Sequence, residues 1–324
     1  MKKQKKFILA LAPMAGYTDL AFRRLASQYE LDWSTTEMVS AKALFYGDKK
    51  TKSLMKVAPD EAKVSLQLFG EDPKIMGKVI GDLSQNPLPY ESFDINMGCP
   101  APKIVKSGAG SALLNDLERG KRMMEEAVKN SSIPISIKVR KGFLEGETTG
   151  LAMAKAAQEM GISWITVHGR SREAYYSGHS DWDFIGEVAE EINIPVIANG
   201  DIKTPEDAHF FYEKTRCQGI AIGREAVGKP YIFKQLKESL KGNPISEYSL
   251  SERIQMGREQ LVMTLEDKDE RLAILEMRKH FIHYFRGIPD AKKIRDRLMT
   301  LKTKEEVLEF VEEIYRKNGG NIDK

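Results

Sequence analysis

Eight short strand-like segments, separated by stretches of helical period, constrain the fold of this chain more than any other feature. The segments cover residues 7–12, 33–37, 63–69, 92–97, 134–139, 164–168, 195–198 and 219–222. They are nearly continuous apolar runs, which is typical of strands covered on both faces. Helical spacing of apolar residues appears between them, at residues 20–29, 73–83, 117–129, 149–160, 184–191 and 205–214. This alternation predicts an α/β fold with a parallel sheet.

The number of repeated units favours a closed sheet. Eight strands in β-then-α order fit a (β/α)₈ TIM barrel of about 250 residues, and the chain has 324. An open doubly wound sheet is the alternative. However, Gly108-Ala109-Gly110 lacks the third glycine of a dinucleotide-binding fingerprint and does not directly follow a strand. We therefore expect a loop at that segment and a barrel overall.

The pattern changes after residue 240. Residues 241–246 form a polar linker, and Ser249 with Glu252 forms a capping box that begins a helix. Helical patterns without strand patterns then continue toward the end of the chain. We predict two domains: a barrel at residues 1–242 and an all-helical domain at residues 243–324.

Positive charge is concentrated in this helical region. The whole chain has a net charge of only +3, but residues 278–304 hold nine Lys and Arg residues against two Asp residues. His280 and His283 lie among these cations, and an apolar stripe that includes Met277 and Phe281 can dock the helix. A basic helical face is often only solvated, but the local excess favours contact with a phosphate backbone. The candidate residues are Arg278, Lys279, Lys292, Lys293, Arg295 and Arg297.

The two cysteines, Cys99 and Cys217, provide neither a disulfide framework nor a Cys/His zinc site. No metal is predicted, and Cys217 is expected in the core. Residues 1–6 carry four lysines ahead of the apolar run at residues 7–12, as in a signal peptide, but that run is short. No apolar stretch approaches the roughly 20 residues that span a bilayer. We therefore expect a reducing, cytoplasmic location and no membrane contact.

Polar and small residues gather where the strands end, which is where parallel barrels build their active sites. Each has an ordinary structural explanation when taken alone: a buried thiol, a surface amide, a snorkelling lysine or a turn. Their recurrence at the same end of successive strands favours a site. The set is Pro13, Met14, Ala15, Gln67, Asn96, Cys99, Lys138, His168, Asn199, Gly200, Asp201, Gly223 and Arg224.

Three kinds of group in this set indicate flavin mononucleotide (FMN). Gln67 offers an amide to the edge of a heterocycle. Lys138 can stabilise negative charge on a reduced flavin ring. The turns at Gly200 and at Gly223-Arg224 suit the phosphate site that such barrels place after their last two strands.

Seven motifs resemble the tRNA-dihydrouridine synthase family, and its bacterial B-type members above all. They are Ala12-Pro-Met-Ala-Gly-Tyr-Thr-Asp19, Gln67-Leu-Phe-Gly70, Asp94-Ile-Asn-Met-Gly-Cys-Pro100, Ile137-Lys-Val-Arg140, Val167-His-Gly-Arg170, Ala198-Asn-Gly-Asp-Ile202 and Ile222-Gly-Arg224. Two further segments, Arg278-Lys-His280 and Tyr284-Phe-Arg-Gly287, resemble the helical domain of that group. Tyr17, Tyr231 and the loop at residues 171–181 depart from the family pattern.

The resemblance implies an FMN-dependent enzyme that reduces the C5–C6 double bond of specific uridines in tRNA, with NADPH or NADH as the electron donor. Hydride would pass from reduced FMN to C6, Cys99 would give a proton to C5, and Asn96 would lie near the uracil. The other strand-end residues would hold FMN, and the basic helical residues would contact tRNA. An ordinary thiol has a pKa of about 8.5, so Cys99 can serve as a proton donor near neutral pH. We expect a monomer with no protein partner.

Two rival functions fit parts of this pattern. A barrel oxidoreductase of the dihydroorotate dehydrogenase kind would act on a free pyrimidine, but it would have no need of a basic helical region. An RNA-binding or chaperone-like protein without catalysis would have no need of the strand-end set.

Overall fold

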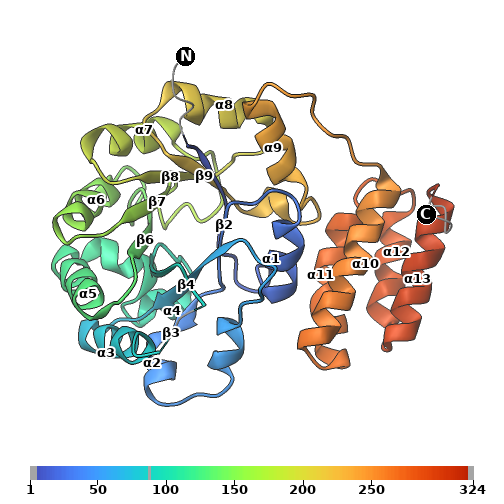
Figure 1. Ribbon diagram of the computed structural model, residues 1–324, viewed down its shortest axis with the longest axis horizontal. Helices are drawn as coiled ribbons and strands as arrows, with labels where there is room; N and C mark the ends of the chain where they lie inside the picture. The colour runs from blue at the N-terminus through green and yellow to red at the C-terminus, as the bar shows by residue number, and fades with distance from the viewer. Residues whose placement is uncertain (1–5, 87–88, 320–324) are drawn as a thin grey trace.

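The chain closes into a parallel barrel (Figure 1). The computed structural model describes residues 6–86 and 89–319. The barrel strands are β1 (Ile8–Leu11), β2 (Trp33–Thr35), β4 (Lys63–Phe69), β5 (Ser92–Met97), β6 (Ile135–Arg140), β7 (Trp164–His168), β8 (Val196–Asn199) and β9 (Gly219–Ile222). Neighbouring strands pair in parallel, and the pairing of β2 with β4 closes the ring. The predicted TIM barrel is confirmed, and the open doubly wound sheet is wrong.

The second predicted strand, at residues 33–37, is interrupted. β2 ends at Thr35, and the two-residue strand β3 (Val39–Ser40) continues the pairing along β4. Between them, the hydroxyl of Thr36 accepts the main-chain N–H of Gln67 at 3.0 Å. The hydroxyl of Thr36 thus takes the place of the main-chain carbonyl that would accept this N–H in a regular strand pairing.

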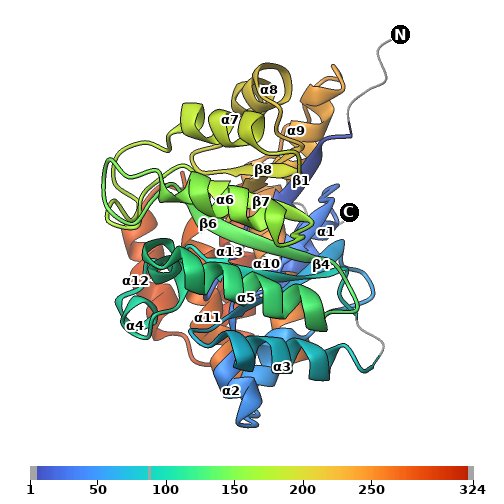
Figure 2. The same cartoon turned by 90° about the vertical axis from the view of Figure 1, so that its left-hand side faces the viewer.

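Helices surround the barrel, and Figure 2 shows α3, α5 and α6 along the side away from the helical domain. The long helices are α1 (Leu20–Ser27), α3 (Pro73–Leu83), α5 (Leu117–Asn130), α6 (Thr149–Glu159), α7 (Trp182–Glu191), α8 (Pro205–Lys214) and α9 (Ile232–Leu240). The short ones are α2 (Ala41–Phe45), α4 (Pro102–Lys106) and the 3₁₀ helices η1 (Thr51–Met55), η2 (Gly110–Asn115) and η3 (Arg224–Ala226). Residues 108–110, predicted as a loop, therefore lead into a 3₁₀ helix.

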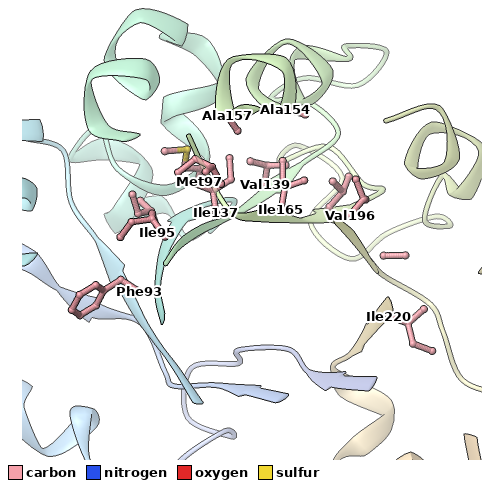
Figure 3. Close-up of a cluster of buried hydrophobic side chains, with 14 of the residues drawn as sticks. Phe93, Ile95, Met97, Ile137, Val139, Ala154, Ala157, Ile165, Val196 and Ile220 are labelled. Atoms are coloured by element: carbon pink, nitrogen blue, oxygen red, sulfur yellow. The ribbon is translucent and has the colours of Figure 1, made fainter. Parts of the chain in front are cut away.

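The two faces of the barrel strands differ in chemistry. Side chains such as Val139 and Ile165 pack against the outer helices, where Ala154 of α6 lies over them (Figure 3). Side chains on the other face of the strands, such as those of Asp94 and Ser136, point inward and line a cavity of about 120 Å³ inside the barrel. The strands are therefore covered on both faces, as predicted, but several of their inward side chains are polar.

The C-terminal region is all helical within the residues that the structure describes. It consists of α10 (Leu250–Asp267), α11 (Glu270–Tyr284), α12 (Ala291–Thr300) and α13 (Lys304–Lys317), around a second core to which Leu25 and Tyr231 of the barrel domain also belong. The capping box of Ser249 and Glu252 begins α10 as predicted. The proposed domain boundary at residues 242/243 lies in the connection between α9 and α10.

Several contacts hold the helical domain against the barrel, among them the packing of α10 on α1, an ion pair and a close approach at a glycine. Lys268, between α10 and α11, pairs with Asp19, the N-cap residue of α1. After β9, Gly228 has a φ of +76°, and a Cβ there would lie 2.6 Å from the Cβ of His283 on α11. Only glycine permits both that conformation and that approach.

The apolar run at residues 7–12 is mostly β1, a core strand. Residues 1–5, which hold most of the lysine-rich start, lie outside the described part. Among the described helices, none combines the length and the apolar character needed to cross a bilayer. Cys217 is fully buried just ahead of β9, as predicted for a core residue.

Candidate active site

A cavity of about 900 Å³ opens where the barrel strands end, and residues of the helical domain complete its wall. This volume suits a cofactor-sized ligand. All thirteen predicted strand-end residues line it, from Pro13 after β1 to Arg224 after β9. The structure therefore brings the whole predicted set together.

The main chain at Cys99 is held from both sides. Its N–H donates to Oδ1 of Asn96 at 2.8 Å, and its carbonyl accepts from the N–H and the hydroxyl of Ser111 at 3.1 and 2.9 Å. Gly110 makes this possible because a Cβ there would lie 2.9 Å from the Cys99 carbonyl oxygen. Burial raises the pKa of the Cys99 thiol, so the thiol is protonated at neutral pH.

The amides of Gln67 and Asn96 are linked to each other and to a buried carboxylate. Nδ2 of Asn96 donates to Oε1 of Gln67 at 2.9 Å, and Nε2 of Gln67 donates to Oδ2 of Asp94 at 2.7 Å. Burial raises the pKa of Asp94, while the hydrogen bonds from Gln67 and Ser136 oppose that shift. Because these two bonds already use one lone pair of Oε1 and one hydrogen of Nε2, a ligand can use only the remaining lone pair and hydrogen of the Gln67 amide.

Lys138 lies opposite Asn96 in the pairing of β5 with β6 and is half-buried in the cavity wall. Burial and the neighbouring Arg140 lower the pKa of Lys138 to about 8. The lysine therefore remains mostly charged at neutral pH. Burial and the surrounding cations hold the pKa of His168 well below its ordinary value, so its imidazole is neutral.

Asp201 organises the turn that follows β8. Its Oδ2 accepts from Nη2 of Arg170 at 2.7 Å and from the N–H of Ser180 at 2.8 Å. Its Oδ1 lies 3.5 Å from Nη2 of Arg224. The carboxylate thus holds the protein's own loop and positions one arginine of the cavity, and it is not itself suited to a phosphate.

The neighbouring glycine and asparagine also shape this end of the cavity. Gly200 has a φ of +114°, and a Cβ there would overlap the hydroxyl of Ser180. Nδ2 of Asn199 donates to the carbonyl of Ala221 at 2.7 Å. A phosphate at this end would therefore meet main chain at Gly200 and Gly223 and the guanidinium of Arg224.

Several lining residues were missed in the sequence analysis. Arg140 had a usable signal because it stands two residues after Lys138 on β6, and period two places it on the same strand face. Arg253 and Arg286 belong to the helical domain and reach the cavity only through domain docking. The full missed set of charged and aromatic residues includes Tyr17, Arg140, Tyr175, Tyr176, Lys203, Glu225, Lys229, Arg253, His283 and Arg286. Because Lys and Arg greatly outnumber the acidic residues, the lining suits a polyanionic ligand.

The predicted basic residues of the helical domain lie elsewhere. In the described part of the chain, none of the six lines the cavity. Arg278 donates to the carbonyl of Leu301 at 2.7 Å, Arg297 pairs with Glu313 at 2.9 Å, and Lys293 pairs with Asp290 at 3.1 Å.

The remaining members of that basic cluster differ in exposure. Lys292 and Arg295 are exposed, and Lys279 lies 5.2 Å from the ring centre of Tyr17, near the cavity. His280, which lies among these cations in the sequence, is 1% exposed and therefore does not belong to their surface. Its ring packs against those of Tyr17 and Phe22 instead.

Comparison with solved structures supports the barrel fold. The chain matches a morphinone reductase with a TM-score of 0.50 at 10% identity, covering 76% of this chain and 88% of that one. It matches a 2-naphthoyl-CoA reductase with a TM-score of 0.55 at 10% identity, covering 73% and 50%. At these identities, the likeness concerns the fold alone.

Comparison of sequences is more specific. Residues 10–318 match the family model described as dihydrouridine synthase (Dus). The probable tRNA-dihydrouridine synthase of Rickettsia conorii is 34% identical over 316 residues, covering 96% of this chain and 95% of that protein. The tRNA-dihydrouridine synthase B of Shewanella oneidensis is 33% identical over 311 residues, covering 95% of each. Because these matches span nearly the whole length of the proteins, this chain belongs to the dihydrouridine synthase family.

Proposed function

We propose that this chain is an FMN-dependent tRNA-dihydrouridine synthase that reduces the C5–C6 double bond of uridine in tRNA, with NADPH as the electron donor. The observation that carries the proposal is a protonated thiol, Cys99, in the wall of a cationic cavity large enough for a flavin. The names of the relatives from Rickettsia and Shewanella support the same substrate class.

The residues present fit FMN. Gly200, Gly223 and Arg224 offer main-chain approach and a positive charge for its phosphate, and Lys138 offers a positive charge for its ring. His168 is neutral and can donate or accept a hydrogen bond. When bound, reduced FMN supplies the hydride for C6 of the base.

Cys99 is suited to give the proton to C5. Its raised pKa keeps the proton on sulfur until a carbanion-like centre can receive it. Once the proton has left, the positive charges of Arg140 and Lys138 stabilise the thiolate. The sulfur-bearing turn is held in one place because the N–H of Cys99 donates to Asn96 and its carbonyl accepts from Ser111.

The rim of the cavity is suited to RNA. A uridine must leave its stack to reach the thiol, and the strand that carries it brings phosphates to the mouth. Arg253 and Arg286 from the helical domain, with Lys203 and Lys229 from the barrel, are placed to meet them. We propose that exposed basic residues of the helical domain, such as Lys292 and Arg295, extend this contact. We further propose a monomer that acts in the cytoplasm.

The test is nucleoside mapping of tRNA from cells that lack the gene, with complementation by the wild type or by Cys99→Ala. We expect one or more dihydrouridines to disappear, to return with the wild type, and not to return with Cys99→Ala. The purified variant should still show the absorbance of bound FMN. An unchanged dihydrouridine content in the deletion strain would contradict the proposed activity.

A further inference from the structure

A continuous chain of buried hydrogen bonds joins Asp94, inside the barrel, to the turn that carries Cys99. Asp94 accepts from Nε2 of Gln67 at 2.7 Å, and Oε1 of Gln67 accepts from Nδ2 of Asn96 at 2.9 Å. Oδ1 of Asn96 then accepts from the main-chain N–H groups of Gly98 and Cys99 at 3.2 and 2.8 Å. The two bonds of Gln67 join β4 to β5, and the two bonds accepted by Asn96 hold the turn that carries Cys99.

Asp94 determines which group donates and which accepts at each step of this series of hydrogen bonds. Both oxygens of Asp94 accept hydrogen bonds, from Gln67 and Ser136, so Gln67 turns its NH₂ toward Asp94 and its oxygen toward Asn96. Asn96 must then turn its own NH₂ toward Gln67, which leaves its oxygen for the Cys99 turn. If Gln67 were reversed, its oxygen would face the carboxylate, and Asn96 would face main-chain donors with its NH₂ group.

A carboxylate at the position of Asp94 lowers the stability of the fold. It is 4% exposed, and its second oxygen is occupied by the hydroxyl of Ser136 at 2.7 Å. Burying a carboxylate costs free energy that a neutral residue of similar size would not. Among the described residues no cation lies within 4 Å of its carboxylate, and the positive charge of Lys138 favours the ionised form only from farther away.

We infer that Asp94 is a positioning residue for the reaction: by fixing the orientation of the Gln67 and Asn96 amides, it holds the Cys99 turn and the single amide face that Asn96 shows to the cavity. Asp94 itself touches neither the substrate nor the cofactor. The part of this inference that concerns turnover rests on the proposed function. The part that concerns the reactivity of the Cys99 thiol does not, because alkylation can be measured without any enzymatic assay.

The first test is Asp94→Leu, which replaces the acceptor with a larger, apolar side chain. We expect the Cys99 thiol to react with iodoacetamide about tenfold faster, because its turn loses a fixed hydrogen bond. We also expect kcat for tRNA reduction to fall about tenfold while KM stays within about twofold. The matched control is Ser65→Ala on β4, which breaks buried bonds to Trp33 and Ser92 but has no link to Asn96.

The second test exchanges the carboxylate of Asp94 with the amide of Gln67. It remains decisive if Asp94→Leu does not fold. Gln67→Glu alone places two carboxylates side by side and should loosen the turn. Adding Asp94→Asn lets Asn donate to Glu, which can still accept from Asn96, so the direction of the chain is restored. We expect the double variant to return the alkylation rate of Cys99 to within about twofold of the wild type.

Either of two results would overturn the inference. One is a double variant whose Cys99 reacts as fast as in Gln67→Glu alone. The other is a Ser65→Ala control that accelerates alkylation as much as Asp94→Leu, which would mean that the effect is general loss of packing. Failure of tRNA turnover in the wild type, with the alkylation pattern intact, would count against the proposed function and not against the positioning role.

Discussion

The side chain of Arg140 donates from Nε to the main-chain carbonyl of Gly98, the residue before Cys99, at 2.9 Å. The same guanidinium donates from Nη1 to the carbonyls of Ser171 and Tyr175, at 2.7 and 2.8 Å. One buried arginine therefore connects the thiol-bearing turn to the loop at residues 171–181, which borders the cavity. The loop that departs from the family pattern is thus tied to the candidate proton donor.

Replacing Arg140 by lysine should loosen this connection. An ammonium group cannot reach three carbonyls in the planar arrangement of a guanidinium, so we expect a loss of about 2 kcal/mol in unfolding free energy and a fall of about tenfold in turnover. Chemical denaturation and tRNA reduction assays measure both. The control is Arg172→Lys in the same loop, whose guanidinium lies over Phe143. Equal effects of the two changes would contradict a special role for Arg140.

The Cys99 thiol should titrate above an ordinary cysteine. Because burial raises its pKa, the thiolate that reacts with iodoacetamide is scarce at neutral pH and forms only as the pH rises past the usual range. Alkylation rates measured against pH, with Cys99→Ala as the blank for Cys217, give the midpoint. A midpoint well below about 8 would make Cys99 a nucleophile rather than a proton donor.

Lys138→Met should separate flavin binding from flavin reduction. The ammonium group is charged below a pKa of about 8, and without it negative charge on the reduced ring is less stable. We expect NADPH to reduce the bound flavin about 100-fold more slowly, measured by stopped-flow absorbance. Lys141→Met is the control because Lys141 pairs with Asp181 and does not line the cavity. A normal rate in Lys138→Met would remove Lys138 from the proposed flavin site.

The RNA surface can be mapped by paired charge reversals. Arg253→Glu with Arg286→Glu changes two cations of the cavity rim, and Lys293→Glu with Arg295→Glu changes two in the predicted helical cluster. We expect the rim pair to weaken tRNA binding about tenfold or more and to lower the slope of log Kd against log salt by about 2. Fluorescence anisotropy over a salt series measures both quantities. An unchanged slope for the rim pair would show that these arginines do not meet phosphates.

The ion pair between the domains predicts a dependence of stability on pH. Burial alone would raise the pKa of Asp19, but its interactions, led by the charge of Lys268, lower that pKa below its ordinary value. The pair therefore stabilises the fold above about pH 4, and this contribution is lost as the pH falls further. Lys268→Met should cost about 3 kcal/mol near neutral pH, since it leaves a buried charge unpaired. It should also move acid unfolding to higher pH.

A second lysine on the same interface supplies the control for that prediction. The side chain of Lys56, which pairs with Asp267, is 49% exposed, so Lys56→Met should cost less than about 1 kcal/mol. Circular dichroism during acid titration distinguishes the two variants. Equal costs would mean that burial of the Asp19–Lys268 pair has no energetic effect.

Much of the fold could be predicted from the sequence because strand and helix periods are local properties. The barrel and the membership of the family are confirmed. The interruption after Thr35 could not be predicted, since it depends on the Thr36 hydroxyl meeting the N–H of Gln67 on a different strand. The inward-facing carboxylate of Asp94 was likewise present in a quoted motif, but its partners became visible only in three dimensions.

The candidate site shows the same division. The strand-end residues could be predicted because parallel strands must end at one mouth. The rim residues Arg253 and Arg286 could not, because their place depends on how the helical domain docks. Burial of His280 also depends on docking, since its neighbours Tyr17 and Phe22 belong to the barrel. The detailed roles of the site residues stay predictions.

The docking of the helical domain, which includes the contacts of Asp19 with Lys268 and of Gly228 with His283, has a consequence for target choice. This docking sets where Lys292 and Arg295, the exposed cations proposed to extend the RNA contact, lie relative to Cys99. Uracil is the same base at every uridine, so only the contour of the folded RNA can decide which one reaches the mouth. The protein would then select a uridine by the shape of the RNA around it.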